Sequence, residues 1–147
     1  MIEFTEAFNK MQVAAKEDNI DIKIISGYRS YNTQVSTYNY WTSKYGKAEA
    51  DKISARPGHS EHQLGLAADI NSLYTSFKDT KEGIWLNNNA YKYGFILRYP
   101  ESKTEETGYS FEPWHYRYVG TSLAEKLYNN GDWITLEDYY GITSKYE

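Results

Sequence analysis

The feature that most limits how this chain can fold is the stretch RPGHSEHQLGLAAD, residues 56–69. It holds two of the only three histidines, His59 and His62, and it ends in Asp69. The run LGLAADI, residues 64–70, predicts a strand. A loop that leads directly into a strand can bring the His62 and Asp69 side chains to one ion. We therefore expect a fold that presents a histidine and a carboxylate together on this unit.

The nature of these side chains points to zinc. Zinc accepts imidazole nitrogen and carboxylate oxygen, and catalytic zinc sites use three protein ligands and leave one position for water. The distant histidine is His115, in EPWHYRY, and Glu112 precedes it by three residues. A carboxylate at that spacing can reach the bound water as a base without being a ligand. His59 remains a competing ligand on spacing alone, although a loop does not impose the helical face that gives H-x-x-H its meaning.

Composition excludes several classes of protein. The chain has no cysteine, which excludes disulfides, thiolate zinc sites and a cysteine nucleophile. The net charge is −4 with both signs mixed along the chain, so no basic stripe suggests nucleic-acid binding. No apolar run approaches the roughly 18 residues that suggest a membrane span. Sixteen tyrosines suit a cleft that holds polar ligands, because tyrosine buries a ring and keeps a hydroxyl.

The length of 147 residues predicts a single domain. The start MIEFTEAF lacks a basic segment followed by an apolar one, which a secretory signal requires. We therefore expect either a cytosolic protein or a domain whose export or anchor segment has been removed. Taken singly, Glu112, Arg29 and Arg117 would be solvated charges.

The apolar pattern predicts alternating helices and strands. One helical face is formed by Phe4, Phe8, Met11 and Ala15, and a second helix runs from a Ser30 cap to about Lys44. The polar segment 99–110 is expected to be a mobile surface loop beside the site. Further helices are expected over 47–55, over 82–94 with Gly94 closing it, and over 121–131 with a Thr or Ser cap. Further strands are expected over 20–25, 95–99 and 114–119.

Three motifs carry a resemblance to a known family. They are SGYRS at Ser26–Ser30, S-x-H-x-x-G-x-A-x-D at Ser60–Asp69, and E-x-W-H at Glu112–His115. The sequence resembles the VanY-type zinc D-alanyl-D-alanine carboxypeptidases and the related L,D-carboxypeptidases. These belong to the wider group named for lysostaphin, D-Ala-D-Ala peptidases and sonic hedgehog. The motifs occur in family order and their span, residues 26–120, covers most of the chain.

The resemblance implies a role for each matched residue. His62, Asp69 and His115 would be the ligands of one zinc ion per chain. Glu112 would be the catalytic base. A second set would act on the substrate: Arg29 would bind it and stabilise developing negative charge, Ser60 would contact the substrate peptide, and Gln34 would line the cleft. His59 falls at a variable position and is not expected to be a ligand.

The fold and function implied are those of a peptidoglycan-processing enzyme. We expect one α+β domain over residues 1–147, with a small, mainly antiparallel sheet carrying the zinc site and helices around it. It would remove a C-terminal D-alanine from peptidoglycan stem peptides, across a D,D- or an L,D-bond, as a monomer at the bacterial cell envelope. A lysin-like endopeptidase and a non-catalytic peptidoglycan-binding module are the alternatives. Glu112 disfavours the latter, since binding needs no base.

Overall fold

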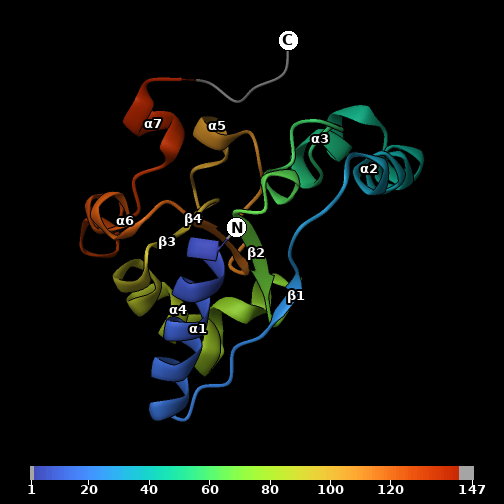
Figure 1. The fold of residues 1–147 in the computed structure, drawn as a ribbon. Helices are drawn as coiled ribbons and strands as arrows, with labels where there is room; N and C mark the ends of the chain where they lie inside the picture. Colours follow the sequence, from blue (N-terminus) through green and yellow to red (C-terminus); the bar gives the residue numbers. More distant parts are fainter. Residues whose placement is uncertain (1, 143–147) are drawn as a thin grey trace.

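The computed structural model describes residues 2–142, and a four-stranded sheet lies at its centre (Figure 1). The strand order is β1-β2-β4-β3, and every neighbouring pair is antiparallel. The strands are short: β1 (Ile24–Ser26), β2 (Ala67–Ile70), β3 (Phe95–Leu97) and β4 (His115–Tyr118). The predicted α+β class with a small antiparallel sheet is confirmed.

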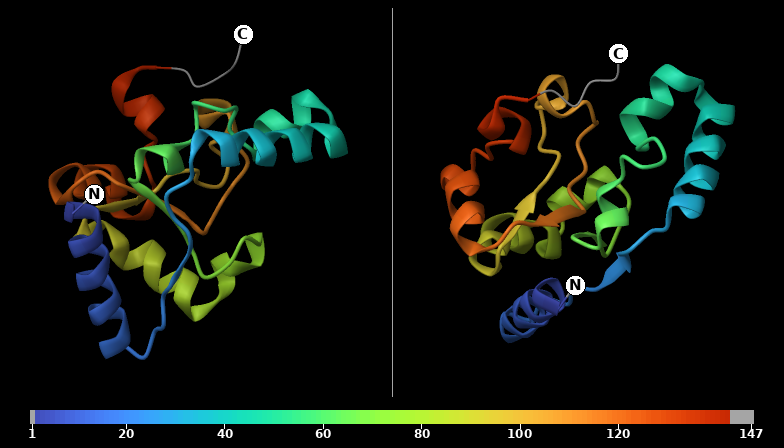
Figure 2. Two further views of the ribbon diagram at one scale, coloured as in Figure 1. Left: turned by 45° about the vertical axis from the view of Figure 1, so that its right-hand side comes forward. Right: turned by 45° about the horizontal axis from the view of Figure 1, so that its top comes forward.

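Seven α-helices within residues 2–142 surround the sheet. They are α1 (Ile2–Glu17), α2 (Tyr31–Tyr45), α3 (Lys47–Ile53), α4 (Lys81–Asn89), α5 (Thr104–Thr107), α6 (Thr121–Tyr128) and α7 (Leu136–Tyr140). Figures 1 and 2 show α6 beside the β3 edge of the sheet, whereas α2 and α3 project beyond the β1 edge. None of the helices in this part of the chain has both the length and the apolar character needed to cross a bilayer.

One face of the sheet packs against the apolar core, and the other carries polar side chains. Successive strand side chains point to opposite faces, so a buried apolar set and a polar set can alternate. Ala68 and Tyr116 are directly opposite each other on β2 and β4, and both belong to the apolar core. The predicted face of α1 covers that core through Phe4 and Phe8, whose rings pack against Phe95. Asp69 and His115, one position along, therefore point to the other face.

The strand expected over 20–25 is shorter than predicted. Only Ile24–Ser26 forms β1, and its register shifts between Ile24 and Ser26. Ile20 and Ile22 are buried outside the sheet, while Ile24 and Ile25 are exposed. The alternating isoleucines therefore reflect packing of this segment against the core. A segment that is buried without strand-to-strand hydrogen bonds can have the same sequence pattern as a strand.

The late helix does not have the predicted Thr or Ser cap. Gly120 is the N-cap of α6, with φ +84° and no side-chain hydrogen bond, so Thr121 is already helical. The first helical bond runs from the Ala124 amide to the Gly120 carbonyl. A backbone conformation that favours glycine decides where this helix begins.

Residues 99–110 are not simply a surface loop. They contain α5, and Tyr99, Thr107 and Tyr109 are buried. The Tyr99 and Tyr109 rings lie 4.7 Å apart, and the Thr107 hydroxyl donates a hydrogen bond to the Tyr109 carbonyl. Tyrosine and threonine can be buried when their hydroxyls or rings find partners, which a reading of polarity alone does not detect.

Gly94 closes the helix predicted over 82–94 as expected, after a 3₁₀ turn over Ala90–Tyr93. Its φ is +92°, and an added Cβ would lie 2.8 Å from a Tyr118 ring atom. Gly94→Ala is therefore expected to lower the free energy of unfolding by roughly 2–4 kcal/mol, from backbone strain and overpacking together. Gly141→Ala is the matched control, since its φ is +66° with no atom within 4 Å. Urea denaturation of both variants checks this, and equal losses would contradict a contribution from the close approach.

Candidate metal centre

Strand register brings the first two candidate ligands together. Asp69 on β2 and His115 on β4 are directly opposite each other, so their side chains lie on the same face of the sheet. The His115 Nδ1 and Asp69 Oδ1 atoms are 3.2 Å apart. They are 46 residues apart in sequence, and the antiparallel pairing of β2 with β4 brings them together in space.

His62 reaches the same point from a 3₁₀ turn, Glu61–Leu64, that precedes β2. The Ser60 hydroxyl caps this turn by accepting from the His62 amide, and Gly65 ends it in the left-handed conformation. The ring Nδ1 lies 2.7 Å from the Gly27 carbonyl oxygen, so Nδ1 carries the proton. Nε2, 3.3 Å from Asp69 Oδ1, is therefore the ring nitrogen that faces the site.

The three side chains form a site that suits a metal ion. One ligand atom from each of His62, Asp69 and His115 lies within 4.8 Å of the others, and all three residues are buried. Within residues 2–142 no other group of histidines and acidic residues meets this description. His59 lies outside the group and is exposed. Two imidazoles and one carboxylate are a donor set typical of catalytic zinc.

The charges around the site favour a cation. Burial by itself would raise the pKa of Asp69, but the hydrogen bonds from His115 and His62 outweigh it and hold the pKa below its usual range. Burial by itself would lower the pKa of His115, but acceptance by Asp69 and Glu61 raises it to about 10. Ionised carboxylates that stabilise a positive charge on His115 also suit a bound metal ion.

Glu112 stands beside this group without belonging to it. A turn hydrogen bond from the His115 amide to the Glu112 carbonyl keeps the two residues at the same end of β4. Glu112 Oε1 is 3.7 Å from His115 Nδ1, and 14% of the side chain is exposed. Burial, with the charges of Asp69 and Glu61, raises the pKa of Glu112 to about 7 against the opposing effect of His115. A pKa near neutrality suits a group that takes up and returns a proton.

Arg29 approaches the site from the end of β1. Its amide donates to the His62 carbonyl, and its guanidinium donates to Gln34 Oε1 and Ser26 Oγ, both at 2.9 Å. One guanidinium nitrogen is 3.9 Å from Asp69 Oδ2. These bonds use two of the five N–H groups of the arginine and leave others for a ligand.

Gln34 and Ser60 are held inside the protein. Gln34 is fully buried, and its amide nitrogen donates to the Ala55 carbonyl and the Ser54 hydroxyl. It therefore fixes the Arg29 guanidinium relative to the end of α3. The Ser60 side chain caps the turn that carries His62. Direct contact of either residue with a substrate stays a prediction.

The sequence did not reveal a set of charged residues behind His115. Glu61 Oε2 lies 3.2 Å from His115 Nε2, and Glu61 Oε1 accepts from Arg98 and Arg117. Arg117 is thus an ion-pair partner and not the solvated charge expected of it in isolation. Arg98 in turn binds the buried Glu137 of α7. Only the position of Glu61 next to His62 offered a signal in the sequence.

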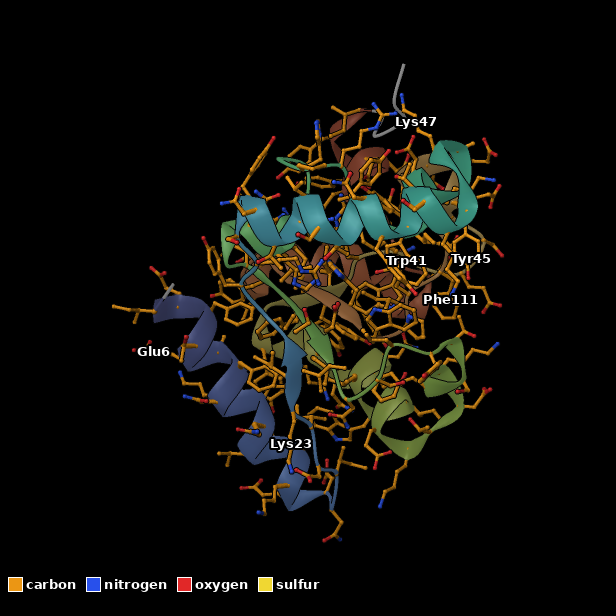
Figure 3. All side chains as sticks on the ribbon, turned by 90° about the vertical axis from the view of Figure 1, so that its right-hand side faces the viewer. Glu6, Lys23, Trp41, Tyr45, Lys47 and Phe111 are labelled. Atoms are coloured by element: carbon orange, nitrogen blue, oxygen red, sulfur yellow. The ribbon has the colours of Figure 1, made fainter. Side chains whose placement is uncertain are left out.

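Two aromatic side chains of α2 pack against each other. The Trp41 and Tyr45 rings are stacked with centroids 5.6 Å apart. In Figure 3 both extend from α2 toward the level of Phe111, the residue before Glu112. Tyr45 is half exposed, whereas the buried Tyr99 lies 4.9 Å from the His115 ring, so the tyrosines contribute both to the surface and to the surroundings of the site.

Comparisons with known proteins agree with this geometry. Residues 2–121 match the VanY family model, described as D-alanyl-D-alanine carboxypeptidase. The putative carboxypeptidase YodJ of Bacillus subtilis is 43% identical over 97% of this chain. A D-alanyl-D-alanine carboxypeptidase of Enterococcus faecalis is 46% identical over 86% of it. The chain spans about half the length of these relatives, 54% and 50%.

Solved structures give the same result. The LdcB LD-carboxypeptidase superposes with a TM-score of 0.88 at 41% identity, over 98% of this chain and 69% of that one. A form of the vancomycin resistance D,D-pentapeptidase VanY in complex with Zn(II) gives 0.83 at 40% identity, over 95% and 82%. With most of its length matched by the family model and by relatives above 40% identity, the chain belongs to the VanY family of D-alanyl-D-alanine carboxypeptidases.

Proposed function

We propose that this chain is a zinc-dependent carboxypeptidase that removes a C-terminal D-alanine from peptidoglycan stem peptides. The observation that carries the proposal is the position of Glu112, a largely buried carboxylate, 3.7 Å from the His115 ring at the edge of a three-ligand site. A site built only to bind would not need a base there. The similar enzymes, a D-alanyl-D-alanine carboxypeptidase and an LD-carboxypeptidase, support the substrate class.

The residues present fit zinc. His62 Nε2, Asp69 Oδ1 and His115 Nδ1 would hold it, because the other ring nitrogen of each histidine already has an oxygen partner. The similar VanY structure that contains Zn(II) supports this choice of metal. When bound, zinc supplies Lewis-acid chemistry that polarises the scissile carbonyl and makes water a stronger nucleophile.

The protein's own groups then move the proton and hold the substrate. Glu112 accepts the proton of the attacking water and later donates it to the amine of the departing D-alanine. The pKa of Glu112, raised to about 7, suits both steps. Arg29 binds the free carboxylate of the terminal residue, because a guanidinium can donate two parallel hydrogen bonds to it. Ser60 assists in holding the peptide, and Gln34 acts through Arg29.

The terminal D-alanine is the part that D,D- and L,D-substrates share, so the proposal covers both bonds. We further propose that the protein acts as a monomer and meets its substrate on the outer side of the cytoplasmic membrane. A single catalytic unit over residues 1–147 is sufficient, since the proposed ligands, base and arginine all come from one chain.

Recognition of a free C-terminus gives the test of this function. A stem peptide ending in D-alanine is expected to be cleaved about 10- to 100-fold more efficiently than its C-terminal amide, the ratio for one charged hydrogen-bonded contact. Arg29→Lys keeps the charge but loses the paired geometry, so both kcat/KM and the preference for the acid should fall. Arg56→Lys, in an ion pair with Asp51 at 2.8 Å, is the matched control.

Product analysis by mass spectrometry on both substrates measures this preference. Equal cleavage of acid and amide by the wild-type protein would contradict the carboxypeptidase and favour an endopeptidase. Loss of the preference in Arg56→Lys as well as in Arg29→Lys would remove Arg29 from its proposed role.

A further inference from the structure

We propose that Glu61 is a positioning residue for His115, and that Arg98 and the α7 residue Glu137 hold Glu61 in place. The proposal rests on the zinc function above and extends it to a part of the chain beyond residue 121, where the match to the family model ends. It assigns the C-terminal helix a role in the metal centre.

The first step is the orientation of the His115 ring. Its Nδ1 faces Asp69 Oδ1 and its Nε2 faces Glu61 Oε2, each at 3.2 Å. With Nδ1 as the ligand atom, the proton sits on Nε2 and is donated to Glu61. A carboxylate in this position fixes the tautomer and orientation of a ligand histidine and raises its basicity.

The second step is that Glu61 is itself fixed. Its Oε1 accepts from Arg98 Nε at 2.6 Å and from Arg117 at 3.0 Å, which leaves Oε2 for His115. Only 10% of the Glu61 side chain is exposed. Glu61 also stands next to His62 in the same 3₁₀ turn. One residue is therefore connected to two of the proposed ligands.

The third step leads to α7. The two terminal nitrogens of Arg98 donate to the two carboxylate oxygens of Glu137, both at 2.6 Å. Glu137 is 2% exposed, and the Thr135 side chain caps its helix. The Arg98 amide donates to the His115 carbonyl, so this arginine is tied to His115 by the sheet as well.

The four charged groups balance each other. Glu61 and Glu137 carry two negative charges, and Arg98 and Arg117 carry two positive ones. A buried ion pair contributes little net stability compared with apolar side chains of similar size, so stability alone does not account for this arrangement. Its geometry is explained if the arrangement keeps Glu61 Oε2 directed at His115, a proposed zinc ligand.

Zinc affinity tests the proposal. Competition with a chelating dye is expected to give at least about 10-fold weaker zinc binding for Glu61→Gln, within the range found for outer partners of metal ligands. Glu137→Gln should weaken binding in the same direction by a smaller factor. Both substitutions preserve size and an acceptor oxygen, which favours folding. Leu127→Ala, in the apolar core and in none of these hydrogen bonds, is the control for lowered stability.

A spectroscopic readout accompanies the affinity. In the zinc-loaded wild type, ¹⁵N-detected histidine spectra should place the His115 proton on Nε2 and show slow exchange with water. Glu61→Gln should exchange that proton faster. The control should have a lower melting temperature, with zinc affinity and proton exchange like those of the wild type.

The proposal is overturned if Glu61→Gln binds zinc as tightly as a zinc-binding wild type, or if Leu127→Ala loses as much affinity as Glu61→Gln. A wild-type chain that binds no zinc at all would overturn the proposed function and this proposal with it. The two failures are distinguishable, because in the first the wild type binds the metal.

Discussion

Replacing Glu112 with glutamine is expected to lower turnover at least about 100-fold while zinc stays bound, the low end for loss of general acid–base catalysis. Glutamine has the size of glutamate and can accept a hydrogen bond, but it cannot take up the proton of the attacking water. The Glu112 carboxylate lies 3.7 Å from His115 Nδ1, close enough to act on a water in the open position of the site. The effect should therefore fall on kcat, with KM little changed.

Steady-state kinetics on a stem peptide, with zinc content measured on the same preparation, checks this result. Glu101→Gln is the matched control, because the Glu101 side chain is 63% exposed and forms an ion pair with Lys78 at 3.7 Å. That variant should retain wild-type turnover. Near-normal turnover in zinc-loaded Glu112→Gln would exclude Glu112 as the base, whereas loss of zinc in this variant would make it a ligand.

Replacing His62 with alanine is expected to remove most of the bound zinc, whereas His59→Ala should leave about one zinc per chain. His62 Nε2 is 3.3 Å from Asp69 Oδ1 inside a buried site, and His59 lies three residues away on the surface. Loss of a residue that only hydrogen-bonds to a metal ligand weakens metal binding by up to about 100-fold. Loss of a ligand itself should therefore weaken zinc binding by at least about 100-fold. Activity should disappear together with the metal.

Zinc per chain, measured by mass spectrometry after dialysis against a weak chelator, distinguishes the two histidines. They are close in sequence and of the same type, so each variant serves as the control for the other. Loss of zinc from His59→Ala but not from His62→Ala would reverse the ligand assignment. Equal zinc content in both variants and the wild type would place the metal elsewhere.

Local sequence determined several elements correctly. Phe4, Phe8, Met11 and Ala15 define the buried face of α1 as their spacing predicted, and Ser30 caps α2. Gly94 ends the helix predicted over 82–94 in the left-handed conformation. These features depend on contacts within a few residues, or on which side of one helix is apolar. Such information is contained in the sequence within one or two turns.

The motifs also identified the residues that meet at the site, but not how they meet. Asp69 and His115 come together because Ala67–Asp69 pairs with His115–Arg117 in one register. A shift of β2 by one residue would turn Asp69 to the core face, away from His115. The bounds of β1 likewise depended on tertiary packing. Ile20 and Ile22 look like strand residues in sequence and are buried outside the sheet.

What only the tertiary structure decided is the set of contacts between segments far apart in the chain. Glu61, Arg98 and Glu137 carry no common sequence signal, since each alone resembles a surface charge. Folding buries them together, and a buried charge must find a partner of opposite sign. Sequence thus determined the buried face of α1, the Ser30 cap of α2 and the chemistry of the candidate ligands. The tertiary fold decided the distances among them, because these depend on strand register and on which charges are excluded from water together.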